Sequence, residues 1–207
     1  MSWTPSHLVS SEAELEALYG LPAGPAVFKE IDHVSDHYRA FIAAAPFVIV
    51  ATSGPGGLDC TPRGDPAGFV RVVDRHTLML PDRRGNNRLD TLRNLVRDPR
   101  IALLFLIPGV GRTLRVNGRA VVTTDPALCD AFAIDGKAPR SVVVITAERV
   151  YTQCPKALIR ARLWDPDAFR TERDLPSSGE ILQALQVDFD GAAYERTYPQ
   201  RVRETMY

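Results

Sequence analysis

The 207-residue chain has few cysteines and no excess of charge of either sign. Its cysteines, Cys60, Cys129 and Cys154, lie far apart without paired spacing, which argues against a disulfide framework and against a zinc site. The 25 basic residues balance the 25 acidic ones, so the charge gives no support for nucleic acid as the main partner. We therefore expect a protein of the reducing cytoplasm with no bound metal.

Long apolar runs and a signal-like N-terminal segment are also missing. The longest apolar run, residues 101–107, is far too short to span a membrane. No G-x-G-x-x-G motif stands between a strand and a helix, no P-loop pattern is present, and strands do not alternate with helices. These absences disfavour a membrane protein and a doubly wound dinucleotide-binding fold, and the length fits one sizeable core.

Histidine is too scarce for common hydrolytic chemistry. The chain has only His7, His33, His37 and His76, and a serine or cysteine nucleophile normally needs a histidine base. His33 and His37 are one helical turn apart, but no carboxylate-rich motif joins them, so two surface histidines are the better interpretation. The paired acids around Pro166 fit a turn better than acid–base catalysis. We assign no catalytic residue.

The apolar pattern predicts a mainly β protein with flanking helices. One helix is expected after a capping box at Ser11 and Glu14, ending at Gly20, and a second from Pro25, with an apolar face that continues to Ile42. Short strands with closely spaced turns favour a small barrel. The strands are expected at residues 47–52, 58–63, 69–73, 77–80, 101–107, 114–121 and 141–151, with 101–107 fully buried.

The most distinctive local pattern is the loop Pro81–Arg88, which follows a predicted strand and precedes a predicted helix. It contains three arginines, two asparagines and a glycine. Guanidinium and amide groups beside the N-terminus of a helix form a favourable phosphate site. A solvated arginine-rich turn is the alternative interpretation.

Further cationic and amide groups are distributed along the chain. Arg63 ends a predicted strand, Arg115 and Asn117 share one face of another, and Cys154 and Lys156 lie at a strand-to-helix corner. Many anion-binding donors without an acid–base pair suit a protein that holds a charged cofactor, since such a cofactor supplies the chemistry itself.

Taken in order, these motifs resemble the pyridoxamine 5′-phosphate oxidase-like flavoproteins, whose fold is an FMN-binding split β-barrel. The resemblance covers about Pro46 to Trp164, and the corner at Tyr151–Arg160 resembles that of a bacterial subgroup of unknown substrate. It is carried by residues 46–63, 78–82, 85–88 with the following helix, 98–105 and 114–120.

The resemblance implies a homodimer with two FMN sites at the subunit interface and a small-molecule substrate. The balanced charge and the short apolar runs lead us to expect no nucleic-acid and no membrane partner. The resemblance also implies that the FMN phosphate is held by Asn86, Asn87 and Arg88, with Arg83 or Arg84 nearby. It implies contacts to the flavin ring from Arg63, Gly64 and Asp82, and further cofactor contacts, in part from the second subunit, from Arg115, Asn117, Cys154 and Lys156.

The resemblance also implies a division into an N-terminal helical covering segment (1–45), a split-barrel flavin-binding core (46–164) and a C-terminal helical segment (165–207) that packs on the core or the partner. The implied function is an FMN-dependent oxidoreductase of unknown substrate. No histidine follows His76, which argues against pyridoxamine phosphate and against haem as ligands. A non-catalytic flavin-binding protein, a deazaflavin-binding protein and a flavin-free interaction module stay open as alternatives.

Overall fold

The computed structural model describes residues 5–207 and contains two compact units, one ending at Glu30 and one spanning Ile31–Tyr207. The first unit holds α1 (Glu12–Tyr19) and α2 (Pro25–Phe28). The Ser11 hydroxyl caps α1 as predicted, accepting the Glu14 amide at 3.2 Å, but the Glu14 carboxylate accepts the amide of Ser10 instead of Ser11. Gly20 follows α1 with a φ of 73°. The three-part division of the chain at residues 45 and 164 stays a prediction.

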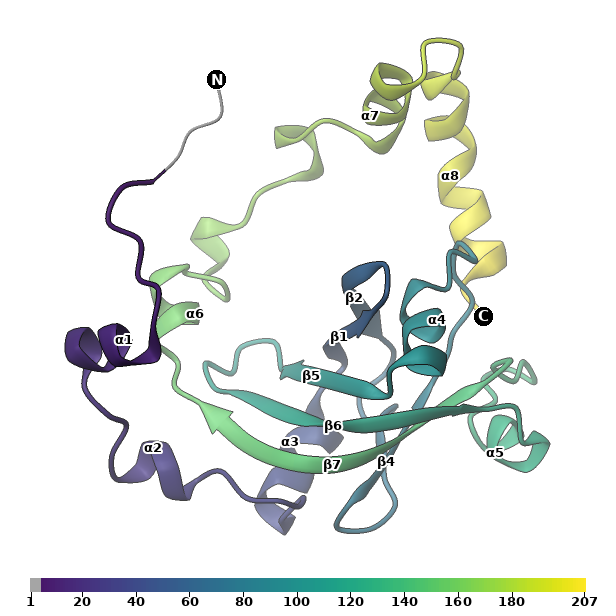
Figure 1. Cartoon of the computed structure of the whole chain (residues 1–207). Coiled ribbons are helices and arrows are strands. Elements are labelled where there is room, and N and C mark those ends of the chain that lie inside the picture. Colours follow the sequence, from purple (N-terminus) through teal and green to yellow (C-terminus); the bar gives the residue numbers. More distant parts are fainter. Residues whose placement is uncertain (1–4) are drawn as a thin grey trace. The chain divides into compact units, whose positions relative to one another are not determined.

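The second unit is built on one antiparallel sheet of seven strands in the order β2-β1-β5-β6-β7-β4-β3 (Figure 1). This sheet with flanking helices confirms the predicted mainly β class. The strands are β1 (Phe47–Gly54), β2 (Gly57–Gly64), β3 (Arg71–Val72), β4 (Thr77–Pro81), β5 (Arg100–Leu106), β6 (Thr113–Thr123) and β7 (Val142–Gln153).

The predicted continuous helix from Pro25 to Ile42 is wrong. α2 stops at Phe28, and α3 (Asp36–Ala44) begins separately after the Ser35 hydroxyl accepts the Tyr38 amide. Between them, Ile31 pairs with Val150 as an isolated β-bridge, with N–O distances of 3.1 and 2.7 Å. Pairing with the sheet therefore overrides the apolar periodicity of this segment. The predicted strand 69–73 is likewise reduced to β3.

Alternate side chains of each strand point to opposite faces, and the main core lies on one face, while a smaller buried cluster of Cys129, Phe132 and Val142 lies on the other. The largest fully buried side chains of the main core are Phe105, Ile42, Leu78, Leu103, Leu114 and Ile145. On β5 only Ile101, Leu103 and Phe105 are buried, while Ala102, Leu104 and Leu106 are partly exposed. The prediction that residues 101–107 form a fully buried strand is therefore wrong for the single chain.

The remaining helices flank or follow the sheet. α4 (Asp90–Arg97) packs on β1, and α5 (Pro126–Ala131) and α6 (Lys156–Arg160) precede and follow β7. Two short 3₁₀ turns, Pro166–Ala168 and Glu172–Asp174, lead to α7 (Ser178–Leu185) and α8 (Gly191–Thr205), which pack on each other. The predicted capping box at Ser177 and Glu180 is confirmed. Across residues 5–207, no helix combines the length and apolar character needed to cross a membrane.

Candidate functional site

A cavity of about 750 Å³ lies between β2, the loop from β4 to α4, and the segment that leads into β7. The backbone brings these segments together, because Pro81 pairs with Val142 and the Asp82 amide donates to the Ser141 carbonyl at 3.0 Å. The cavity collects seven of the residues predicted to contact a cofactor. These are Arg63, Asp82, Arg83, Arg84, Asn86, Asn87 and Arg88.

The loop between β4 and α4 has a constrained backbone. Asn87 and Leu89 have φ angles of 59° and 61°, in the left-handed region. Asparagine tolerates this region, but a leucine there costs about 1–2 kcal/mol. The Asn86 side-chain oxygen accepts the Arg88 amide at 3.1 Å, and α4 starts without a side-chain cap at Leu89. Such local strain is typical of functional loops, and here it presents the first turn of α4 to the cavity.

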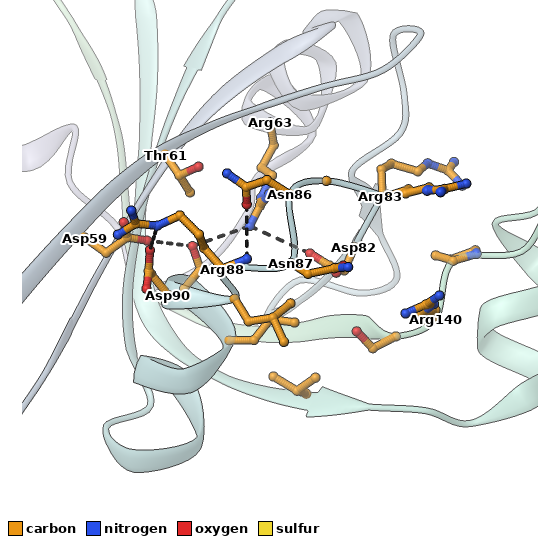
Figure 2. A pocket seen from close by; sticks show the side chains of 18 of the residues that line it. Asp59, Thr61, Arg63, Asp82, Arg83, Asn86, Asn87, Arg88, Asp90 and Arg140 are labelled. Atoms are coloured by element: carbon orange, nitrogen blue, oxygen red, sulfur yellow. Dashed lines mark hydrogen bonds and ion pairs between the residues drawn. The ribbon is translucent and has the colours of Figure 1, made fainter. Parts of the chain in front are cut away.

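Two of the arginines predicted to bind the cofactor, Arg88 and Arg63, pair with carboxylates of the chain itself. The Arg88 Nε donates to Asp90 at 2.8 Å, and an Arg63 Nη lies 3.7 Å from Asp82 and 3.4 Å from the Thr91 hydroxyl (Figure 2). The Arg88 side chain is 75 % exposed, so its ion pair with Asp90 is a weak surface pair. An anionic ligand can therefore replace Asp90 as the partner of Arg88.

Asp82 is the buried carboxylate of the cavity. Its side chain is only 17 % exposed, and burial raises the pKa of Asp82 above the ordinary value, an effect that the Arg63 guanidinium opposes. Arg63 points toward Asp82 from β2, while Asn86 and Asn87 lie on the loop between them and Arg88 (Figure 2). Ionisation of Asp82 in the folded protein therefore carries a cost in desolvation free energy.

Arg83 and Arg84 have different surroundings although they are adjacent. The Arg83 Nε donates to Asp65 at 2.6 Å, and its Nη1 donates to the Phe132 carbonyl at 2.8 Å. Arg83 therefore fixes the loop to the rest of the unit. Within the part of the chain that the structure describes, Arg84 forms no ion pair, which leaves its charge available to a ligand.

Sequence reasoning missed two cations of this cavity, Lys137 and Arg140. They precede β7, and Arg140 lies on the same side of the cavity as Arg83 (Figure 2), because the backbone of Asp82 bonds to the adjacent Ser141. Six basic side chains (Arg63, Arg83, Arg84, Arg88, Lys137 and Arg140) thus line the cavity against three acidic ones (Asp59, Asp82 and Asp90), an excess of three positive charges. A concave wall with such an excess attracts small anions. The only sequence pattern that could have identified them is their position shortly before a run of β-branched residues that predicts a strand.

Five predicted cofactor residues do not line the cavity: Gly64, Arg115, Asn117, Cys154 and Lys156. Arg115 pairs with Leu104 and Asn117 with Ala102 across β5 and β6, so both lie on the outward, partly exposed face of the sheet. Arg115 donates to the Tyr151 hydroxyl at 2.9 Å. Among residues 5–207, the Asn117 side-chain oxygen is the buried side-chain atom without a hydrogen-bond partner.

The strand-to-helix corner carries Cys154 and Lys156, the latter as the first residue of α6. Cys154 is exposed and, like Cys60 and Cys129, forms no disulfide. Among residues 5–207 no cluster of three or more histidine, cysteine, aspartate or glutamate side chains has the geometry to hold a metal ion.

Residues 34–154, more than half of the chain, match the sequence profile of the family described as pyridoxamine 5′-phosphate oxidase. No curated protein matches the chain. Among solved structures, HupZ of Group A Streptococcus is 19% identical with a TM-score of 0.49, and the alignment covers 58% of this chain and 94% of HupZ. General Stress Protein 26 from Bacillus anthracis is 13% identical with a TM-score of 0.42, covering 55% and 88%. A FAD-binding protein from Mesorhizobium loti is 16% identical with a TM-score of 0.40, covering 58% and 94%.

Proposed function

The chain belongs to the pyridoxamine 5′-phosphate oxidase family and has its split-barrel fold, and we propose that it is an oxidoreductase that binds FMN in the cavity described above. The excess of cations around the strained loop between β4 and α4 carries this proposal. A bound flavin supplies hydride transfer, and the protein supplies binding and orientation. The substrate class is a small molecule.

The donor set of the cavity fits a phosphorylated flavin. Arg88, Asn87 and the uncapped first turn of α4 offer charge and amide donors to a phosphate. Arg63 supplies a second guanidinium from β2. Apolar wall atoms come from Cys60, Leu92 and Val122, among others, and give a ring a surface to pack on.

We propose that the second subunit of a homodimer completes this site. The outward face of β1 and β5 carries an exposed side chain, Phe47, and four partly buried ones, Ile49, Ala51, Leu104 and Leu106. Cys60, which lines the cavity, pairs with Ala51 at the edge of this face. A partner on this face brings its own Arg115 and Asn117 toward the cavity, and the unpaired Asn117 oxygen then gains a donor.

The first test identifies the ligand. The purified protein is expected to be yellow, and the pigment released on denaturation is expected to have the absorbance and mass of FMN. A released deazaflavin would replace the cofactor assignment. A colourless protein that takes up no FMN would overturn the proposal and leave a flavin-free interaction module.

The second test addresses the phosphate donors. Arg88→Ala is expected to weaken FMN binding by about 10- to 100-fold, because a charge-assisted hydrogen bond contributes about 1.5–3 kcal/mol. Arg97→Ala is the matched control, since Arg97 lies in the last turn of the same helix and outside the cavity. Equal FMN retention by both variants, measured by titration of the flavin-free protein, would contradict the phosphate assignment.

The third test separates an enzyme from a passive flavin carrier. Stopped-flow mixing of the FMN-loaded protein with NADH or NADPH is expected to bleach the flavin absorbance within seconds. Absence of bleaching with both donors would favour the non-catalytic flavin-binding alternative.

A further inference from the structure

Tyr207 contributes to the wall of the cavity although it lies far along the sequence from the other lining residues. Its hydroxyl donates to Oδ1 of Asp65 at 2.8 Å. The Asp65 side chain is 1 % exposed, and its other oxygen, Oδ2, accepts from Arg83 at 2.6 Å. The Arg83 guanidinium lies 5.6 Å from the centre of the Tyr207 ring. Both oxygens of a buried carboxylate are thus satisfied only while Tyr207 is in place.

The position of Tyr207 depends on few contacts. Within residues 170–207, the hydrogen bonds and ion pairs of the described chain are internal to that segment, except for the bond from Tyr207 to Asp65. α8 packs on α7, and the two helices approach closely where Gly179 faces Gly191. A wall held by one hydrogen bond and one cation–ring contact opens more readily than the sheet behind it.

The Tyr207 end of the cavity is not the end with the phosphate donors. Arg83, whose guanidinium lies near the Tyr207 ring, lies across the cavity from Arg88 and Asp90 (Figure 2). The bond to Asp65, together with burial, raises the pKa of Tyr207, so the hydroxyl stays protonated as a donor at neutral pH. Tyr207 therefore lines the part of the cavity next to Arg83, away from Arg88.

We propose that Tyr207 is a movable wall of the cavity, closed while its hydroxyl is bonded to Asp65, and that the ligand exchanges faster when this bond opens. For the choice of FMN as the ligand, this inference rests on the proposed function. It predicts a kinetic signature, because a gate slows association and dissociation by the same factor, whereas a simple ligand contact slows dissociation alone.

The test uses the full chain with Tyr207→Phe, which removes the hydroxyl, and Tyr207→Ala, which removes the wall. Tyr198→Phe and Tyr198→Ala are the matched controls, since Tyr198 lies on α8, stacks on Tyr194 and does not line the cavity. Both FMN rate constants, measured by stopped-flow fluorescence, are expected to rise about tenfold in Tyr207→Phe and at least as much in Tyr207→Ala. Unchanged rate constants, or a change in dissociation alone, would overturn the gate.

A second readout needs no ligand. Hydrogen exchange of the peptide containing residues 203–207 is expected to be faster in Tyr207→Phe than in the wild type, and unchanged in Tyr198→Phe. If the protein binds no FMN, the proposed function fails, and this exchange measurement still decides whether Tyr207 is held closed. Equal exchange rates in the wild type and Tyr207→Phe would show that the hydroxyl bond to Asp65 does not keep Tyr207 in its closed position.

Discussion

At the scale of single residues, Asp82 couples the cavity to the stability of the fold. Burial raises the pKa of Asp82 above 3.8, the ordinary value, so the ionised form is disfavoured in the folded protein. The favourable contribution of Asp82 to the free energy of unfolding is therefore present below pH 3.8, where the carboxyl is protonated. This contribution is lost as the pH rises through the pKa of Asp82 in the folded protein. Asp82→Asn is expected to raise the thermal unfolding temperature of the ligand-free protein at neutral pH, with the gain vanishing in acid.

Asp98 provides a control of opposite sign for this prediction. Hydrogen bonds from Arg100 hold the pKa of Asp98 well below its usual range. The stabilising contribution of Asp98 to the fold is therefore present at neutral pH and is lost as the pH falls. Asp98→Asn is expected to lower the unfolding temperature at neutral pH. An Asp82→Asn protein that is also less stable at neutral pH would show that the contact with Arg63 outweighs the burial penalty.

Asp90 competes with any phosphate for Arg88, and this gives a second prediction at the residue scale. Asp90→Asn removes the carboxylate that the Arg88 Nε contacts at 2.8 Å, and it also removes a negative charge from the cavity wall. FMN affinity is expected to rise by up to about fivefold, since an exposed ion pair is worth about 0.2–1 kcal/mol. Titration of the flavin-free protein with FMN measures this affinity. A loss of affinity would mean that Asp90 organises the loop and does not compete with the ligand.

At the scale of elements, Gly118 fixes how β6 lies against β7. The register between these strands shifts at Asn117 and Gly118, and a Cβ atom at Gly118 would clash with the backbone carbonyl of Thr146. Gly118→Ala is expected to destabilise the protein by about 1–3 kcal/mol, since the strands must move apart. Gly56→Ala is the control, because open space surrounds Gly56. Equal urea unfolding midpoints for the two variants would contradict this account.

The elements that sequence patterns predicted well are those with a local cause. The strands expected at 47–52, 114–121 and 141–151 are found as β1, β6 and β7, because β-branched runs and alternation act within a few residues. The broken helix after Pro25 shows the limit of this approach. Ile31 satisfies the helical apolar pattern, but its backbone pairs with Val150, a partner that no local pattern identifies.

The residues of the candidate site also fall into those that local sequence identified and those that only the tertiary structure brings to the cavity. Residues 82–88 form a continuous loop, so composition alone pointed to them. Lys137 and Arg140 reach the same cavity only because β7 pairs with β4, and Tyr207 reaches it after two further helices. The half-exposed side of β5 could not be anticipated either, since a run of seven apolar residues does not reveal whether one chain or two cover it.

At the scale of the whole molecule, that apolar face gives the last prediction. Leu104 lies at the centre of the outward face, paired with Ile49 on one side and Arg115 on the other. Leu104→Glu places a carboxylate where a partner subunit is proposed to pack, and burying it in the interface is expected to cost more in desolvation than an ion pair with the neighbouring Arg115 returns. Light scattering is expected to give twice the 22.8 kDa chain mass for the wild type and the single-chain mass for Leu104→Glu.

The variant is also expected to lose FMN affinity, because Arg115 and Asn117 of the partner are then absent from the cavity. Val96→Glu is the control, since Val96 is 79 % exposed on α4 and away from this face. A wild-type protein with the mass of one chain would refute the dimer. A monomeric Leu104→Glu that binds FMN as tightly as the wild type would keep the dimer but confine the cofactor site to a single chain.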